Sequence, residues 1–321
     1  MTAQTLVYVH GAGAQKPAAE LKQDLDRLLF GHDLASSRVA YYADVRWPPA
    51  GAIGGRRLPG AASTKAVRER TVRAVEDPQV SPKAAARAIV TAALASGAPG
   101  PIAARGAGAV AGGSGGAAAA GGAGAELVAQ LYRRADNIAK RSSAESRGLT
   151  AGLSFPDPIF RRVVGFFASD VIDYLYGQFR EPMRARVRQA LLNGPPPKVI
   201  VAHSLGTIIV YDVLNEPGFA GLDVQLLVTA GCPLGIGNVQ SRLRDGAGRP
   251  NPVPTPVKAW SNFADRWDPV ALDPTLRNEF LPPKDLPRDE TVNNPAKDNH
   301  DLTGYLSVGI VRSTIVAAVG S

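Results

Sequence analysis

One serine of the chain, Ser204, has the neighbours that a catalytic nucleophile needs. Residues 199–206 read Val-Ile-Val-Ala-His-Ser-Leu-Gly, an apolar run that ends in the pattern small-x-Ser-x-Gly. A serine hydroxyl is a weak nucleophile, and a sharp turn between a strand and a helix can lift it toward a base. Such a turn is crowded and strained, so the residues two before and two after must be small, as Ala202 and Gly206 are. The segment predicts a nucleophile elbow, with alanine in place of the usual first glycine.

The segments around Ser204 have the order strand, turn and helix that this motif requires. Residues 198–201 are rich in β-branched side chains and follow a Gly-Pro-Pro-Pro loop, while residues 207–214 continue as an apolar helix that ends near Pro217. Because short motifs also occur by chance in a chain with 34 glycines, this context rather than the motif alone favours a working elbow.

A serine nucleophile needs a base within hydrogen-bond distance, and the chain has four histidines. His203 is next to the serine, and adjacent side chains leave a strand on opposite faces, so we do not expect it to bond Ser204. For His32, after the first predicted helix, a surface or capping role is expected, and His10 lies in the first strand-to-helix loop. His300 remains, in a polar loop before the last predicted helix, where capping that helix is the alternative role. It is favoured as the base because the order Ser, acid, His is typical of this motif.

The base in turn needs a carboxylate that fixes its tautomer, and residues 260–271 offer Asp265 and Asp268. Asp268 is favoured because its Asp-Pro-Val setting places the carboxylate on a turn before an apolar residue. Asp265 is the second choice, since it is next to Arg266 and could instead anchor the loop. Other acids are too close to the base in sequence or too far along the helix after the elbow: Asp298, Asp301 and Asp212.

Acyl transfer also needs backbone N–H groups aimed at the oxygen on which charge develops, the oxyanion hole. Leu205 follows the nucleophile and starts a helix, so its N–H is one expected donor. The loop after the first strand, with Gly11 and Ala12, is the other expected source, although a plain tight turn is the alternative. Neither a cofactor nor a metal ion is needed for this chemistry, and we expect none.

The composition describes a globular chain. With 321 residues, 45% of them hydrophobic, it can bury a large core as one large domain or two smaller ones. Its single cysteine, Cys232, excludes an internal disulfide and favours a reducing, cytoplasmic compartment; we expect a buried structural thiol. An apolar strand begins at Leu6 with no basic region or cleavage site before it, which argues against a signal peptide.

The positive charge, a net +8, is concentrated in the middle of the chain. Residues 61–190 hold 18 Lys or Arg against 10 Asp or Glu. This excess could attract an acidic partner, but solvated helix faces are the plainer explanation, and without a nucleic-acid module or interleaved aromatic residues we expect no nucleic-acid binding. Residues 106–125 are uncharged but almost wholly Gly and Ala, which disfavours bilayer insertion and leaves only peripheral membrane contact open.

Strand and helix signals alternate on both sides of a long insertion. Residues 6–9, 18–30 and 38–45 read as strand, helix and strand, a start that implies a parallel sheet. The pattern resumes near Phe166 with an amphipathic helix that runs toward Leu192. Later elements are predicted as strands at 224–230 and 256–263 and a closing helix at 302–319.

We therefore predict an α/β fold in one domain, residues 1–321, with a mostly parallel central sheet flanked by helices. Residues 48–165 are predicted as a helical, Ala/Gly-rich insertion before the nucleophile strand, a cap, lid or accessory subdomain beside the carboxyl edge of the sheet. Its helices are expected at about 63–76, 82–95 and 126–145.

Together these segments resemble the α/β-hydrolases, and more narrowly their lipase- and esterase-like members. The matching segments are residues 6–11, 199–206, 229–235 and 268–270, with His300. The resemblance covers residues 1–47 and about 166–321. It implies Ser204 as nucleophile, His300 as base, Asp268 as acid, and a small-molecule or lipid-like carboxylic ester as substrate. One departure is that lids of this family often follow the strand after the nucleophile, whereas this insertion precedes the elbow.

Two alternatives remain open at this point. A peptidase, amidase or thioesterase would use the same Ser, His and Asp set and differ only in the leaving group. A hydrolase-fold protein whose basic helical insertion docks a partner or an acidic membrane surface belongs to another class, because a fold alone does not establish activity. The sequence carries no signal of oligomeric state.

Overall fold

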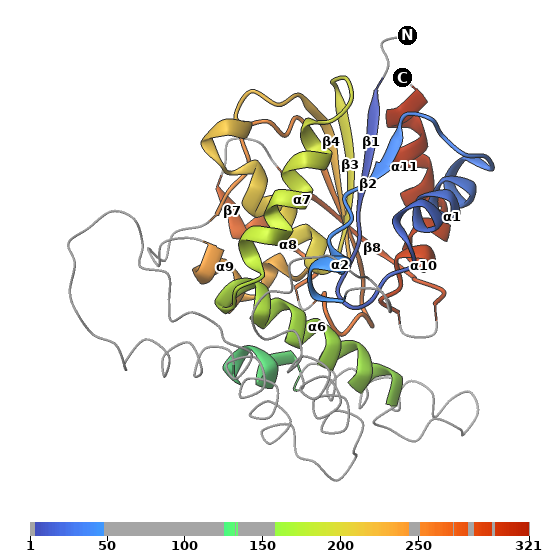
Figure 1. Cartoon of the computed structure of the whole chain (residues 1–321). Helices are drawn as coiled ribbons and strands as arrows, with labels where there is room; N and C mark the ends of the chain where they lie inside the picture. Colours follow the sequence, from blue (N-terminus) through green and yellow to red (C-terminus); the bar gives the residue numbers. More distant parts are fainter. Residues whose placement is uncertain are drawn as a thin grey trace, which may run out of the picture. The chain divides into compact units, whose positions relative to one another are not determined.

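The computed structural model describes residues 4–47, 125–131, 133, 158–243, 251–271, 273–281, 286–296 and 299–320. The chain divides into two compact units, one of Met1–Pro48 with Glu181–Ser321 and one of Pro49–Arg180. The first unit holds the predicted elbow and the other predicted site residues in the described part of the chain, and Figure 1 labels most of its helices and strands. Most of the predicted insertion, including its first two helices and the Gly/Ala tract, lies outside the described residues, and with it the basic surface of the non-enzyme alternative.

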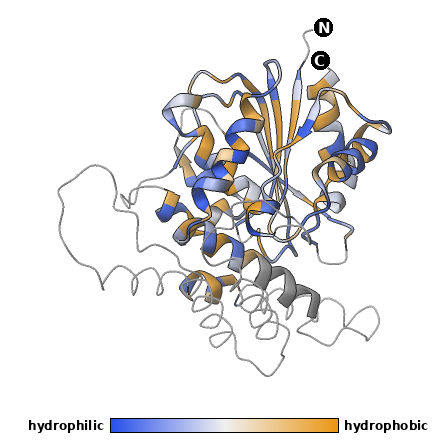
Figure 2. Ribbon diagram, viewed as in Figure 1, coloured by the Kyte–Doolittle hydropathy of each residue, from blue (hydrophilic) through white to orange (hydrophobic). Residues whose placement is uncertain are grey.

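A parallel six-stranded sheet forms the centre of the first unit in the part of the chain that the structure describes. The strand order is β2-β1-β3-β4-β6-β8, and each neighbouring pair is parallel. The strands are β1 (Thr5–Val9), β2 (Ser37–Val39), β3 (Lys198–His203), β4 (Val224–Ala230), β6 (Trp260–Asp265) and β8 (Arg288–Val292). Every residue of β1 and β3 is buried, as expected for central parallel strands covered on both faces, and Figure 2 shows their hydrophobic colouring.

Helices cover the two faces of this sheet (Figure 1). On one face lie α1 (Ala18–Phe30), α10 (Leu302–Ser307) and α11 (Gly309–Gly320), and on the other lie α7 (Arg180–Leu192) and α8 (Leu205–Leu214). Leu25 and Leu29 of α1 pack with Ile315 of α11 in the buried cluster on the strands. The burial of these apolar side chains is the main contribution that stabilises the packing of the helices on the sheet, and so the elements that position the site.

The remaining elements are short or lie in the second unit. Among its described residues the first unit also contains α2 (Ala43–Arg46), α9 (Gly237–Leu243), three 3-10 turns and a small parallel pair, β5 (Asn251–Pro252) with β7 (Phe280–Leu281). The turns are η1 (Pro217–Phe219), η2 (Pro233–Gly235) and η3 (Leu276–Glu279). In the second unit α6 (Pro158–Tyr176) and residues 125–131 are helical. Over the described residues, no helix combines the length and apolar character that crossing a membrane requires.

The predicted α/β architecture with a parallel central sheet is confirmed, but several element boundaries were wrong. The second strand ends at Val39 instead of continuing to residue 45, because the chain leaves the sheet and Tyr42 bonds to the loop after β1. The helix predicted from 166 to 192 is two helices, and so is the closing one. The strand predicted at 256–263 begins later, at Trp260. The edge strand β8 was missed because its sequence, RDETV, has four mostly exposed polar residues and no apolar alternation.

The strand order places the point where the direction of winding reverses next to the predicted site. From β1 the chain moves outward to β2 on one side and, later, to β3 on the other, so the direction of winding reverses between β1 and β3. In open parallel sheets, ligands bind beyond the carboxyl ends of the strands at this switch point. The loop with Gly11 follows β1 there, and Ser204 follows β3.

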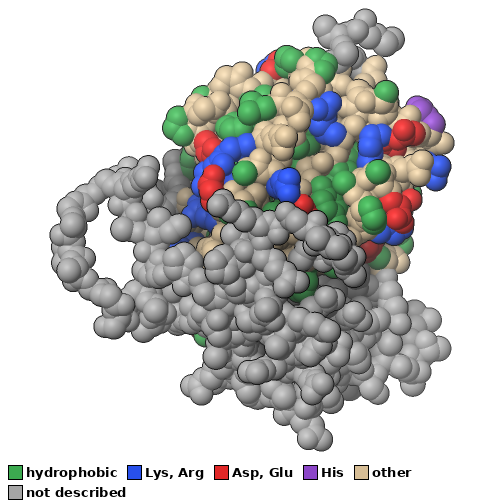
Figure 3. Space-filling view, in the orientation of Figure 1, with side chains coloured by type: hydrophobic (Ala, Val, Ile, Leu, Met, Phe, Trp, Pro, Cys, Tyr) green, Lys and Arg blue, Asp and Glu red, His purple; other side chains and the backbone are tan. Residues whose placement is uncertain are grey.

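Several charged side chains of the first unit form pairs with opposite charges. On the face in Figure 3, Lys and Arg side chains lie among Asp and Glu side chains. In α7, Arg188 contacts both Glu181 and Glu216, with its nitrogens 2.5 and 2.7 Å from their oxygens. Such partly exposed pairs contribute little to stability.

Candidate active site

The turn at Ser204 has the strained geometry of a nucleophile elbow. Ser204 connects β3 to α8 with a φ of 53° and a ψ of −127°, a region that L-residues rarely adopt. A Cβ at Gly206 would lie 2.4 Å from the carbonyl oxygen of His10 and 2.6 Å from that of Val9. Only glycine fits where α8 passes the end of β1, so the expected requirement for a small residue after the serine has a definite steric cause.

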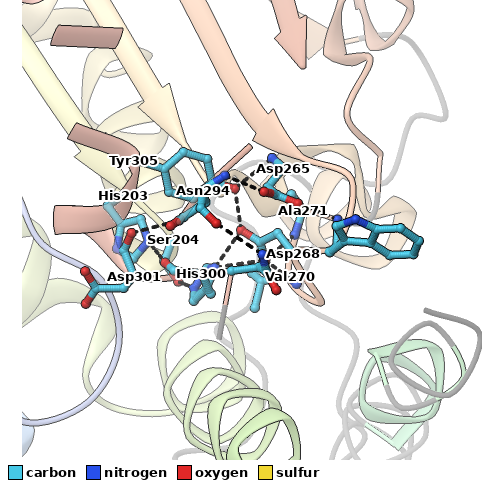
Figure 4. Close-up of polar contacts among 12 residues, drawn as sticks. His203, Ser204, Asp265, Asp268, Val270, Ala271, Asn294, His300, Asp301 and Tyr305 are labelled. Atoms are coloured by element: carbon cyan, nitrogen blue, oxygen red, sulfur yellow. Dashed lines mark hydrogen bonds and ion pairs between the residues drawn. The ribbon is translucent and has the colours of Figure 1, made fainter. Parts of the chain in front are cut away.

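The elbow brings Ser204 to His300, and His300 to Asp268, over 96 residues of sequence (Figure 4). Ser204 Oγ lies 2.9 Å from His300 Nε2, and His300 Nδ1 lies 2.9 and 2.8 Å from Asp268 Oδ1 and Oδ2. A carboxylate only accepts hydrogen bonds, so Nδ1 carries the proton and Nε2 is free to accept one from the serine hydroxyl. The exposed fractions of the three residues are 1%, 7% and 0%, respectively. The arrangement suits proton abstraction from the serine.

Asp268 is held by more than the imidazole. The N–H groups of Val270 and Ala271 donate to Oδ1 at 2.7 and 3.2 Å, and the Tyr305 hydroxyl donates to Oδ2 at 2.7 Å. Burial alone would raise the pKa of Asp268, but the charge of His300 and these hydrogen bonds outweigh it and hold the pKa below its usual range. The carboxylate therefore remains ionised beside the imidazole. Tyr305 lies in α10, and no local sequence signal marks it.

Asp265, the second-choice acid, has a different position at the end of β6. Its carboxylate accepts the N–H of Trp267 at 2.6 Å and that of Asn294 at 2.5 Å. Burial raises its pKa, against the effect of these two donors. Because both donors are backbone groups of neighbouring loops, Asp265 has the geometry of a loop anchor, the other role considered for it.

The loop before α10 points the His300 side chain toward Ser204. The N-cap of α10 is Asp301, whose side chain accepts the N–H of Gly304 at 3.0 Å, so the helix is capped without the histidine. Asn299 has a φ of 55°, and its N–H donates to the carbonyl of Ala296. Asp212 forms an ion pair with Arg184, 3.4 Å away, and Asp298 lies outside the described residues.

The other histidines take separate structural positions. The Nε2–H of His203 donates to the backbone carbonyl of His300 at 2.6 Å, and the two ring centroids are 4.7 Å apart. Burial, and then the charge of His300, lowers the pKa of His203 to about 3. His32 is exposed, and its Nδ1 lies 3.0 Å from the carbonyl oxygen of Phe30 at the end of α1. The contact of His203 with the base was missed because it depends on the fold of a distant loop.

The loop after β1 lies against Ser204. A Cβ at Gly11 would lie 3.0 Å from Ser204 Cβ and 2.7 Å from His203 Nδ1, so the backbone of Gly11 approaches the serine directly. Ala12 follows it, half-buried. Leu205 is the first residue of α8, and the N–H groups of a first helical turn have no acceptor within the helix. Gly11 and Leu205 thus lie next to Ser204, and Ala12 follows Gly11 in the same loop.

Two residues after β4 complete the surroundings. Gly231 has a φ of 55°, and a Cβ there would lie 2.8 Å from Asp268 Oδ2 and 3.0 Å from His300 Cε1, so a side chain would displace Asp268 and His300. Cys232 is buried, and its Sγ donates to Thr207 Oγ1 at 3.3 Å. Burial raises the pKa of its thiol to about 12, which keeps it protonated and inert. Among the described residues, no group of three or more His, Cys, Asp or Glu side chains could hold a metal ion.

Two buried histidines give stability a predicted pH dependence. Burial lowers the pKa of His10 to about 4 and that of His203 to about 3, while an unfolded chain titrates near 6.5. Between these values the unfolded chain binds more protons, so acid should lower the free energy of unfolding by about 1.4 kcal/mol per pH unit for each histidine. Urea unfolding followed by tryptophan fluorescence between about pH 7.5 and about pH 5 measures this slope.

Matched substitutions test whether the buried histidines cause this pH dependence of the free energy of unfolding. His203→Gln keeps a neutral side-chain donor and should remove one histidine's share of the slope. His32→Gln alters an exposed histidine and should leave the slope unchanged. Stability that is constant or rises on acidification would contradict the assignment.

Comparison of the chain with protein-family models, with curated proteins and with solved structures finds no match in any of the three. Its function must therefore be inferred from the geometry of the site.

Proposed function

We propose that this protein is a serine hydrolase of the α/β-hydrolase fold that cleaves carboxylic esters through an acyl-enzyme on Ser204. The observation that carries the proposal is the continuous hydrogen-bonded line from the Ser204 hydroxyl through His300 to Asp268, buried beside a glycine loop. A base, an orienting acid and nearby backbone donors are the groups that acyl transfer from an activated serine requires.

The reaction proceeds in two balanced halves. Ser204 Oγ attacks the ester carbonyl while His300 Nε2 takes its proton, and the carbonyl oxygen becomes an oxyanion near the N–H groups of Leu205, Gly11 and Ala12. The tetrahedral species collapses as His300 returns the proton to the departing alkoxide, which leaves as the alcohol and an acyl-serine. Water then attacks the acyl carbon, His300 accepts its proton and returns it to Ser204 Oγ, and the carboxylic acid is released.

The fold supports the proposal independently of these distances. The nucleophile stands at a strained turn between a parallel strand and a helix, and the groups occur in the chain order Ser, Asp, His. The switch point of the sheet lies at the same edge. These features match the elbow of the α/β-hydrolases, with Ala202 in place of the first glycine.

The choice of an ester over an amide or thioester rests on the resemblance to lipases and esterases. An amide would be cleaved by the same steps but with a poorer leaving group. Turnover of p-nitrophenyl esters compared with matched p-nitroanilides and thioesters separates the three, and a preference for anilides would replace the esterase proposal by an amidase.

Labelling with a fluorophosphonate tests the proposed chemistry directly. We expect the probe to modify the protein stoichiometrically and mass spectrometry of the digested protein to place the adduct on Ser204. Heat-denatured protein is the control and should remain unlabelled, because labelling requires the assembled base. A native protein that stays unlabelled, or carries the adduct on another serine, would contradict the proposal.

A further inference from the structure

Tyr42 closes over the loop that follows β1, although it comes from the segment after β2. Its hydroxyl donates to the carbonyl oxygens of His10 at 2.5 Å and Gly11 at 3.2 Å. Its backbone N–H donates to His10 Nε2 at 3.1 Å, and its ring stacks on the imidazole with centroids 3.9 Å apart. One tyrosine thus fixes both peptide groups that precede Ala12.

His10 completes this arrangement, and its tautomer follows from its two partners. Nε2 accepts from Tyr42, so the ring proton is on Nδ1, which donates to the carbonyl of Gly11 at 2.8 Å. Burial lowers the pKa of His10 to about 4 and raises that of Tyr42 well above its ordinary value. Both side chains remain neutral donors through the physiological pH range.

These bonds determine where the amides of the loop point. Peptide groups are planar and trans here, so an N–H points away from the carbonyl of its own peptide group. With the carbonyls of His10 and Gly11 held by Tyr42, the N–H groups of Gly11 and Ala12 face away from the tyrosine. Gly11 itself lies against Ser204, since a Cβ on it would come within 3.0 Å of Ser204 Cβ.

We propose that Tyr42 and His10 are positioning residues, which hold the loop so that its N–H groups form the oxyanion hole of the proposed hydrolase. The inference rests on the proposed function, because it assigns a role within the same reaction. Neither side chain touches the reacting atoms. They should stabilise the transition state more than the bound ester, because the oxyanion forms only in the transition state and the loop N–H groups are placed to bond it.

Tyr42→Phe tests this role, and Tyr41→Phe is the matched control. Tyr41 is the adjacent tyrosine, half-buried, and its hydroxyl donates at 3.4 Å to the carbonyl of Gln15. With p-nitrophenyl butyrate as substrate, we expect Tyr42→Phe to lower kcat by about tenfold to a hundredfold. This is no more than the fall in kcat that follows the removal of one oxyanion-hole donor. KM should change by no more than about twofold. Tyr41→Phe should behave as the wild type.

Two further measurements distinguish a changed orientation of the loop N–H groups from a general loss of structure. An alkyl trifluoromethyl ketone forms a tetrahedral oxyanion on the serine, so its inhibition constant should rise by the same factor as kcat falls. The pH midpoint of kcat should stay in place, because Ser204, His300 and Asp268 are untouched. A purely structural role would not link kcat to the ketone affinity at constant KM.

The outcomes are decisive in each direction. A folded Tyr42→Phe with normal kcat and normal ketone affinity overturns the inference while the proposed function stands, and so does a shifted pH midpoint with normal ketone affinity. If Tyr42→Phe does not fold, His10→Asn takes its place and should lower kcat and ketone affinity together; normal values overturn the inference. A wild-type protein without labelling or turnover removes the proposed function and this role with it.

Discussion

Replacing Ser204 by alanine is expected to lower kcat for p-nitrophenyl ester hydrolysis by about 10⁶-fold, because no covalent intermediate can form. Residual turnover would come from substrate binding and the backbone donors alone. The variant should fold, since the side chain loses only one hydroxyl and the φ of 53° is retained by the packing of Gly206 against β1. Stopped-flow or long-incubation absorbance assays on purified wild type and variant measure the loss.

The same assay, applied to two further variants, tests whether Ser204 and His300 act together. Ser204 Oγ and His300 Nε2 are 2.9 Å apart and act on one proton, so His300→Ala should cost about as much as Ser204→Ala, and the double variant should be no slower than either. His32→Ala, at an exposed position, is the matched control and should keep full activity. Losses that multiply in the double variant would show that serine and histidine do not work as one unit.

The sequence predicted the elements around the nucleophile well because their signals are local. A β-branched run, a small residue, Ser204 and Gly206 determine strand, turn and helix within a few positions, and β3 and α8 lie where these signals place them. The pairing of His300 with Ser204 was also within reach, since the chain order of the motif leaves one histidine to choose. The bounds of α1 and β4 were predicted to the residue, and residues that end regular structure adjoin both elements: Pro17 and Gly31 flank α1, and Gly231 follows β4.

What the sequence did not show depends on contacts between distant segments. Tyr42 lies 32 residues from His10 and Tyr305 lies 37 from Asp268, and each makes its contact through a hydroxyl that no local pattern marks. The strand predicted to continue to residue 45 stops early for the same reason, since Tyr42 bonds to the β1 loop instead of a neighbouring strand. Gly231 could have been noticed as a glycine ending a strand, but its proximity to the acid–base pair required the fold.

Asp268→Asn is expected to lower kcat by about 10⁴-fold without loss of fold. The asparagine amide would present N–H groups to His300 Nδ1, which favours the tautomer protonated at Nε2, and that nitrogen then cannot accept the serine proton. The N–H groups of Val270 and Ala271, which bond Oδ1, would still donate to the asparagine carbonyl oxygen. The NH2 group would take the place of Oδ2 and could donate to the Tyr305 hydroxyl, which is able to accept, so the loop should stay in place. The pH profile of kcat, measured with p-nitrophenyl butyrate, reports the change in the base.

Asp265→Asn is the matched control, because it makes the same chemical change three residues earlier, at the end of β6. Its carboxylate bonds two backbone N–H groups, of Trp267 and Asn294, and an amide can accept at only one oxygen. We therefore expect a loss of about 1–3 kcal/mol in the free energy of unfolding, measured with urea, and at most a small change in kcat. If the two variants exchanged these effects, the acid would be Asp265. The two carboxylates differ in their partners: Asp268 bonds an imidazole that gains and loses a proton in the proposed reaction, whereas Asp265 bonds backbone amides that keep their protons.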